Sequence, residues 1–189
     1  MGPNKIKVER ALVCGLGSIG ERHLGLLRQR LPKAQIMVLR HRHHDGGPIP
    51  NADLCVSSLD EALAFKPQVA IVASPATVHA QQAIALIKTG AHVLVEKPMA
   101  ISLEDGKDLL EVAARSPGYL VCAPHVLLSP DYQEMHRRIS SEGIGKPLLA
   151  RARYGWNGPD WGKWFYAPGG GPLFDLGVYN VTSLTGLLG

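Results

Sequence analysis

The sequence predicts an α/β fold, a doubly wound parallel sheet, followed by the start of a second, α+β domain. Short continuous apolar runs, typical of strands buried on both faces, recur along the first two thirds of the 189 residues. Segments with the apolar spacing of helices separate these runs. After about residue 124 this alternation stops, so we expect one domain at 1–124 and a partial second domain at 125–189.

The first predicted strand, at 11–14, ends in a glycine-containing segment. Leu24, Leu27 and Leu31 then recur at spacings of three and four, which indicates a tight turn followed by a helix. The pattern also predicts strands at 35–39, 69–73, 92–95 and 119–122, and helices that begin at the Ser58–Glu61 capping box or occupy 78–89 and 102–115.

The second domain is expected to contain a helix at 132–140, one strand at 148–154 and a helix at 173–188. Between the last two lies a loop crowded with aromatic residues, namely Trp156, Trp161, Trp164, Phe165 and Tyr166. Aromatic rings in a loop often anchor the loop by packing against an apolar sheet, and they also stack on sugar rings. Both interpretations stay open.

Composition excludes several classes of protein. Hydrophobic residues make up 46% and charged residues 19%, as in globular proteins. No apolar run reaches the roughly 18 residues of a membrane span, and the amino end does not resemble a signal peptide, so we expect a cytoplasmic protein without a membrane partner. The net charge of +4 comes from scattered basic residues, which does not favour a nucleic-acid partner.

No metal site is expected. Each cysteine has apolar neighbours and no ligand spacing, which favours buried thiols over disulfides or metal ligands at Cys14, Cys55 and Cys122. Three nearby histidines lack a carboxylate or cysteine partner and are typical of a solvated loop: His41, His43 and His44.

Gly15, Gly17 and Gly20 lie between the first strand and the first helix. This position needs a tight turn, a close approach of the backbone to phosphate, and close packing of the helix on the sheet. Ser18 and Ile19 then start the helix, whose unpaired N–H groups suit a pyrophosphate. The sequence therefore predicts a Rossmann domain that binds a nicotinamide dinucleotide through this loop.

The residue after the second strand indicates which dinucleotide is bound. NAD-binding folds usually place an acidic residue there, about 20 residues after the glycines, to bind the ribose hydroxyl. Here the strand ends in Leu39-Arg40-His41-Arg42. Because an Arg can pair with the 2′-phosphate, Arg40 favours NADP over NAD. The alternative is that Arg40 and Arg42 are solvated charges.

Lys97 follows a buried strand and is expected at the carboxyl edge of the sheet, where ligands bind in this architecture. Its ammonium could bind a substrate hydroxyl and transfer a proton. The alternative is an ordinary surface lysine paired with Glu96. Asp175 and Tyr179, four residues apart in a predicted helix, share one face and could meet a sugar-like substrate, although Asp175 alone would be taken for a capping residue.

Together these residues resemble the glucose–fructose oxidoreductase, inositol dehydrogenase and rhizopine catabolism family (Gfo/Idh/MocA). The matching motifs are Gly15–Gly20, the Ala73-Ser74-Pro75 strand end with His79 in the next helix, the segment from Gly90 to Pro98 with its Glu96-Lys97-Pro98 motif, and the segment from Gly169 to Tyr179.

The resemblance implies that Lys97 is catalytic and that the peptide before Pro98 is cis. It also implies cofactor contacts from Ser74, Pro75, His79, Glu96 and Lys97, alongside Gly15, Gly17, Ser18, Ile19, Gly20 and Arg40. Many members have a histidine acid or base where this chain has Tyr179. The glucose–fructose oxidoreductase branch has Tyr there, so Tyr179 would donate or relay the proton while Asp175 orients substrate hydroxyls.

The implied reaction is hydride transfer between NADP or NAD and a hydroxyl of a sugar, cyclitol or related polyol. Two other functions stay open: a binding module without turnover, and NAD-assisted glycoside cleavage. Family members usually continue for about 150 residues more, within ordinary domain sizes. We therefore expect a truncated gene product or a fragment, whose lone strand at 148–154 needs a covering chain, for example in a homo-oligomer.

Overall fold

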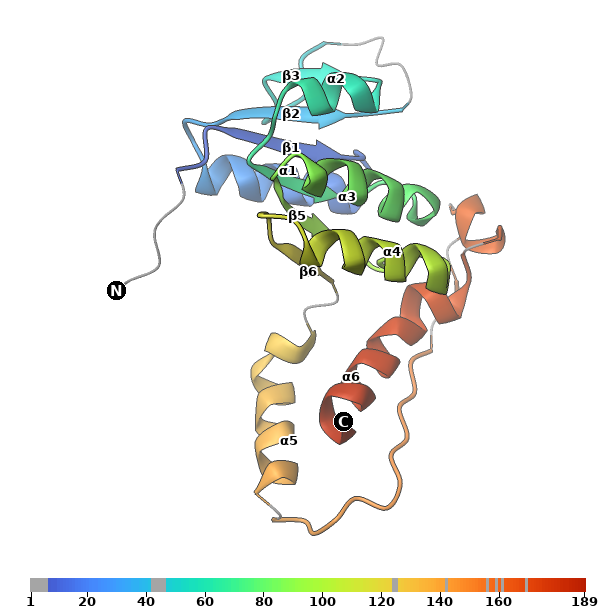
Figure 1. Cartoon of the computed structure of the whole chain (residues 1–189). Helices are drawn as coiled ribbons and strands as arrows, with labels where there is room; N and C mark the ends of the chain where they lie inside the picture. Colours follow the sequence, from blue (N-terminus) through green and yellow to red (C-terminus); the bar gives the residue numbers. More distant parts are fainter. Residues whose placement is uncertain are drawn as a thin grey trace. The chain divides into compact units, whose positions relative to one another are not determined.

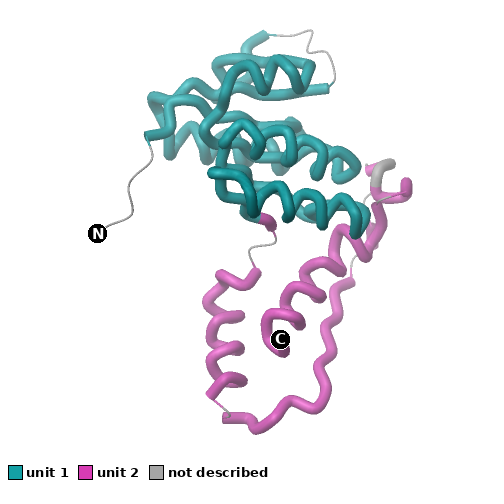
Figure 2. Tube along the Cα trace, in the orientation of Figure 1, with its two compact units in different colours: residues 1–121 teal, residues 122–189 magenta. Residues whose placement is uncertain are grey.

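The computed structural model describes residues 7–41, 47–123, 126–141, 143–155, 157–158, 160, 162–168 and 170–189. The chain divides into two compact units, Met1–Val121 and Cys122–Gly189, coloured separately in Figure 2. The first unit contains nearly all of the sheet. The second is built from helical segments and extended chain.

The first unit is built on a sheet of six parallel strands, which confirms the predicted doubly wound fold (Figure 1). The spatial order is β3-β2-β1-β4-β5-β6, so the direction of strand addition reverses between β1 and β4. The strands are β1 Arg10–Cys14, β2 Gln35–Leu39, β3 Leu54–Val56, β4 Val69–Val72, β5 His92–Val95 and β6 Leu120–Cys122. The short edge strand β3 was not expected.

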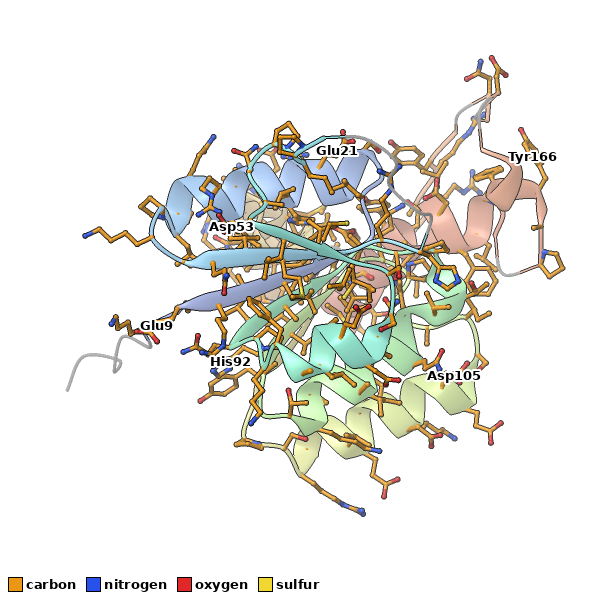
Figure 3. All side chains as sticks on the ribbon, turned by 90° about the horizontal axis from the view of Figure 1, so that it is seen from above. Glu9, Glu21, Asp53, His92, Asp105 and Tyr166 are labelled. Carbon is orange, nitrogen blue, oxygen red and sulfur yellow. The ribbon has the colours of Figure 1, made fainter. Side chains whose placement is uncertain are left out.

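Helices cover both faces of this sheet. As Figure 3 shows, α1 lies on one face and α2, α3 and α4 lie on the other. Each begins close to where the sequence predicts a helix, and the capping box at Ser58 and Glu61 is present. The bounds are α1 Ser18–Arg30, α2 Leu59–Ala64, α3 His79–Lys88 and α4 Leu103–Ala114, with a 3₁₀ turn at Ala76–Val78 before α3.

The core lies between the sheet and these helices. Towards α1, a cluster of buried residues is formed by Ala11, Val13, Leu24, Ile36, Val38 and Ile49. Towards α3 and α4, Leu86, Ile87 and Leu109 are fully buried. The apolar runs that predicted strands are thus the residues that exclude water on both faces, as parallel sheets require.

Asp53 fixes the outer part of the sheet, just before β3 (Figure 3). Its Oδ2 accepts a hydrogen bond from the backbone N–H of Ile36 at 2.7 Å and one from Arg28 at 2.6 Å. These contacts lower the pKa of the Asp53 carboxyl below its usual value, the hydrogen bond from Ile36 being the largest cause. One carboxylate therefore links α1, β2 and the start of β3.

The carboxyl ends of the central strands lie at one level. In the ladder, Cys14 pairs with both Leu39 and Val72, and Val72 pairs with Val95. Each of these residues is the last of its strand. The loops that follow β1, β2, β4 and β5 therefore leave the sheet along the same edge, where doubly wound folds bind their ligands.

The second unit corrects one prediction: the described chain from 143 to 155 forms no strand. The physical reason is that a single extended segment needs a neighbouring strand to form a ladder, and the described part of this unit offers none to it. The unit consists of α5 Pro130–Ser140, a π-helical turn at Leu173–Gly177, α6 Val178–Leu188 and 3₁₀ turns at Val126–Leu128 and Lys163–Tyr166.

The expectation of three buried thiols is wrong for one residue. Cys14 is buried and Cys122 half-buried, but Cys55 is exposed because β3 lies at the edge of the sheet. Of the loop aromatics, Phe165 is buried and Tyr166 is 71% exposed, while Trp156 and Trp161 lie outside the described residues, as do His43 and His44. Among the described residues, no helix is long and apolar enough to cross a bilayer, and no three potential ligand side chains cluster as a metal site.

Candidate functional site

The three glycines of the loop between β1 and α1 meet different surroundings. Gly15 has φ +91°, and a Cβ there would lie 2.6 Å from the backbone of Ala73 and Ser74. A Cβ on Gly20 would overlap the carbonyl of Gly15. A Cβ on Gly17 would meet no described atom within 4 Å. Gly15 and Gly20 therefore allow the loop to pack, whereas Gly17 leaves its outer side open for a ligand.

The amino end of α1 follows directly. Gly17 is the N-cap of α1, and because glycine has no side chain, this residue provides no side-chain capping hydrogen bond to the first turn. Ser18 and Ile19, both exposed, are its first residues. The first-turn N–H groups and the positive end of the helix dipole suit a pyrophosphate, so this loop fits a dinucleotide.

Arg40 lies where the sequence predicts it, immediately after β2. Its backbone N–H donates to the carbonyl of Val56 at 2.9 Å, which fixes the start of the loop beyond the strand. Because Cys14 and Leu39 are paired in the ladder, Arg40 and Gly15 leave adjacent strands at the same edge. Arg40 thus borders the glycine loop from the β2 side.

The end of β4 supplies Ser74 and Pro75. Ser74 is half-buried, and its hydroxyl donates to Gln82 at 2.6 Å, while Pro75 is exposed. His79, at the start of α3, is only 2% exposed. Its Nε2 lies 2.7 Å from the carbonyl oxygen of Ser74 and its Nδ1 lies 2.8 Å from that of Pro98.

Glu96 is the first residue after β5. Its Oε1 lies 2.7 Å from Nε2 of His23, which belongs to α1, and its Oε2 accepts from the backbone N–H of Lys97 at 3.2 Å. The hydrogen bond with His23 is the largest cause of a lowered pKa of the Glu96 carboxyl, and partial burial opposes it. The side chains of His23 and Glu96 are 19% and 14% exposed, so the contact is largely shielded from water.

Lys97 is half-buried at the carboxyl edge of the sheet. The Lys97–Pro98 peptide is cis, as the resemblance implies. Glu96 on one side of Lys97 contacts α1, and Pro98 on the other side contacts α3. The lysine is therefore the middle residue of a turn that is held at both ends.

Asp175 and Tyr179 belong to the second unit. Asp175 lies in the π-helical turn and donates its backbone N–H to the carbonyl of Gly171, and Tyr179 lies in the first turn of α6. The ring of Tyr179 stacks on Tyr154, with centroids 6.3 Å apart. An open cavity of about 480 Å³ in this unit is lined by Arg153, Tyr154, Gly155 and Leu176.

Comparison with known proteins identifies the family. The model of an oxidoreductase family with an NAD-binding Rossmann fold, GFO_IDH_MocA, matches residues 9–122. The chain belongs to the Gfo/Idh/MocA family. The model of the Gfo/Idh/MocA C-terminal domain matches residues 132–189. Both the Rossmann prediction and the family resemblance are thereby confirmed.

Similar curated proteins include two carbohydrate enzymes. The chain is 27% identical over 164 residues to D-glucoside 3-dehydrogenase of Escherichia coli (strain K12), an alignment that covers 85% of this chain and 44% of that protein. It is 34% identical over 111 residues to 1,5-anhydro-D-fructose reductase of Ensifer adhaerens, covering 56% and 33%. The chain therefore spans less than half the length of either relative.

A solved structure shares the fold. The WlbA dehydrogenase of Bordetella pertussis, in complex with NADH and UDP-GlcNAcA, superposes with a TM-score of 0.75 at 22% identity. The match covers 97% of this chain and 59% of that one.

In this Gfo/Idh/MocA chain the first unit brings most of the predicted site residues to one edge of the sheet: the glycine loop, Arg40, Ser74, Pro75, Glu96 and Lys97, with His79 buried behind them. Asp175 and Tyr179 both lie in the second unit, in the π-helical turn and in the first turn of α6. Sequence reasoning missed His23, whose partner lies 73 residues further along the chain. The sequence feature that could have indicated His23 is its place near the amino end of α1, the helix that follows the glycine loop.

Proposed function

We propose that the chain forms the dinucleotide-binding part of an NAD(P)-dependent oxidoreductase acting on a hydroxyl of a sugar, cyclitol or related polyol. One observation carries the proposal. Lys97, a residue able to exchange protons, follows β5 at the edge of the sheet to which the open glycine loop also belongs. The carbohydrate enzymes to which the chain is similar support this substrate class.

A bound nicotinamide would supply a hydride acceptor or donor. Gly17 gives the backbone access to the pyrophosphate, and the first-turn N–H groups of Ser18 and Ile19 donate to it. Ser74 and Pro75, at the end of β4, border the same edge beyond the point where strand order reverses. The chain's own residues thus provide a phosphate site and two adjoining walls.

Oxidation of a secondary alcohol to a ketone removes a hydride from carbon and a proton from oxygen. Lys97 hydrogen-bonds the reacting hydroxyl and takes up or returns that proton. Tyr179 donates or relays the proton, and its stacking on Tyr154 restricts its ring. Asp175, one helical turn before Tyr179, accepts hydrogen bonds from other substrate hydroxyls.

Within this function we assign NADP as the preferred cofactor and NAD as the alternative. Arg40 supports the assignment because it takes the place at which NAD-binding folds usually have an acidic residue. Its guanidinium can form charge-assisted, bidentate hydrogen bonds with a 2′-phosphate.

The first experiment is a fluorescence titration of the purified chain with NADPH and NADH, followed by a sugar and polyol panel monitored at the nicotinamide absorbance. Binding with substrate-dependent reduction of the oxidised cofactor supports the proposal. Binding without turnover on any substrate favours a module that holds a dinucleotide and catalyses nothing. Sugar release without net reduction would instead indicate NAD-assisted glycoside cleavage, and an absence of binding overturns the assignment.

Replacement of the lysine tests the chemistry. Lys97→Ala is expected to abolish turnover and leave cofactor affinity nearly unchanged, because the glycine loop and α1 bind the phosphates. Lys88→Ala, at the exposed end of α3, is the matched control and should retain both. Equal loss of binding and turnover in Lys97→Ala would contradict a catalytic role.

A further inference from the structure

The turn formed by Glu96, Lys97 and Pro98 is held by two histidines from opposite faces of the sheet. His23 belongs to α1 and His79 to α3, which lie on different faces (Figure 3). We propose that both are positioning residues that fix the Lys97 side chain for proton transfer. The inference rests on the proposed catalytic role of Lys97 and adds two residues that act through others.

His79 fixes the turn at Pro98. Both ring nitrogens lie within 2.8 Å of carbonyl oxygens, Nδ1 facing Pro98 and Nε2 facing Ser74. Carbonyl oxygens only accept hydrogen bonds, so each tautomer of the neutral ring donates one of the two bonds, and a doubly protonated ring donates both. With a proton on Nδ1 the ring donates to Pro98 and ties the turn after β5 to α3, and the doubly protonated ring also bonds the end of β4.

Burial distinguishes this role from direct contact with a ligand. His79 is the one buried polar residue among the described residues, at 2% exposure. Both of its nitrogens face protein carbonyls, and little of the ring surface is open to solvent. His79 therefore influences the site through the backbone of Ser74 and Pro98 rather than by touching cofactor or substrate.

His23 fixes the turn at Glu96. Its Nε2 contacts one carboxylate oxygen at 2.7 Å, and the other oxygen accepts from the backbone N–H of Lys97. The carboxylate thus connects α1 to the peptide group of Lys97 itself. Because α1 also carries the phosphate-binding loop at its amino end, His23 couples the place of Lys97 to that loop.

These contacts restrict Lys97 from both sides. The backbone at residue 96 is tied to one helix, and the backbone at residue 98 is tied to another. Because proton transfer requires hydrogen-bond distance, a shift of about 1 Å in a reacting group can reduce the rate by roughly 100-fold. Loosening either end of the turn should therefore reduce kcat more than it affects binding.

The test compares His23→Ala with His23→Gln, whose amide N–H₂ can still donate to Glu96, and uses the exposed His136→Ala as a matched control. For His23→Ala we expect kcat to fall about 10- to 100-fold with KM and dinucleotide Kd unchanged. His23→Gln should recover most of the loss, and His136→Ala should behave as the parent chain. His79→Leu, which has no hydrogen-bond donor for either carbonyl and is checked for folding by circular dichroism, should resemble His23→Ala.

A second readout does not depend on turnover. Lysines of the whole chain are reductively methylated with ¹³C, and the Lys97 signal is assigned by its disappearance in Lys97→Arg. We expect His23→Ala and folded His79→Leu to move this signal and His136→Ala to leave it in place. An unmoved Lys97 signal in both variants overturns the positioning role. Full turnover by Lys97→Ala would instead refute the catalytic role of Lys97, so the two failures are distinguishable.

Discussion

Gly20 packs against the carbonyl of Gly15 so closely that a side chain at Gly20 would occupy the space of that oxygen. The turn between β1 and α1 therefore depends on the absence of a Cβ within the protein, while Gly17 faces open space. Within this six-residue loop, Gly15 and Gly20 are thus needed for packing inside the protein, whereas Gly17 is the glycine that leaves room for a ligand.

This separation gives the first prediction. Gly20→Ala should lower the free energy of unfolding by about 1–3 kcal/mol, the usual cost of overpacking. Gly17→Ala should change stability much less but weaken dinucleotide binding, because its methyl group enters the space left for the pyrophosphate. Urea denaturation and fluorescence titration of both variants measure the two effects. Unchanged dinucleotide affinity in Gly17→Ala would contradict this interpretation of the loop.

Arg40 provides the second prediction. Arg40→Ala should weaken NADPH binding by about 1.5–3 kcal/mol, the range for hydrogen bonds to charged groups, and leave NADH binding almost unaffected. Competition titrations with the two cofactors measure the difference. Arg30→Ala, in the last turn of α1, is a matched loss of one exposed positive charge. A parallel loss of affinity for both cofactors would argue that Arg40 does not read the 2′-phosphate.

The third prediction concerns acid stability. The pKa of Glu96 in the folded chain is lowered, first by its hydrogen bond with His23. A lowered pKa means that the contact stabilises the fold above the unfolded value near 4.5 and that this contribution is lost as pH falls through the folded pKa. Glu96→Gln should therefore lose less stability than the parent between about pH 5 and 3.

Urea midpoints measured across that range test the third prediction. His23→Ala removes the largest cause of the lowered pKa, so its pH profile should resemble that of Glu96→Gln. Identical profiles for the parent and both variants would show that the contact contributes nothing to acid stability.

The fourth prediction concerns the thiols. Burial raises the pKa of Cys14 to about 12 and that of Cys122 to about 11. Cys55 is exposed at the sheet edge. Since the thiolate is the reactive form, iodoacetamide at about pH 8 should alkylate Cys55 first. Peptide mass spectrometry locates the label, and Cys55→Ser should remove the fast phase; rapid labelling of Cys14 would be incompatible with its burial.

Sequence patterns predicted the central strands because their residues are apolar on both faces. They failed at β3, where only Leu54, Cys55 and Val56 pair at an exposed edge, a run too short to stand out. They also failed at 148–154, because extended residues form a strand only when a second segment pairs with them. Propensity describes one segment, whereas pairing depends on two.

The candidate site shows the same division. Gly15, Gly17 and Gly20 were recognisable because their roles are local to one turn. Lys97 was recognisable because a buried strand precedes it and its motif resembles that of a family. The contact of His23 joins residues 73 positions apart and the contact of His79 with Pro98 joins residues 19 positions apart, so local sequence does not predict either contact.

The common level at which the central strands end has a consequence for protein engineering. Residues that fix the fold lie within the strands, whereas Arg40, Ser74 and Lys97 lie just beyond them, each on a different loop. These loops are coupled, because His79 contacts the carbonyl oxygens of both Ser74 and Pro98 and Glu96 contacts α1. A redesign of the β5 loop must therefore keep both histidine contacts, so that this edge of the sheet is engineered as one connected unit.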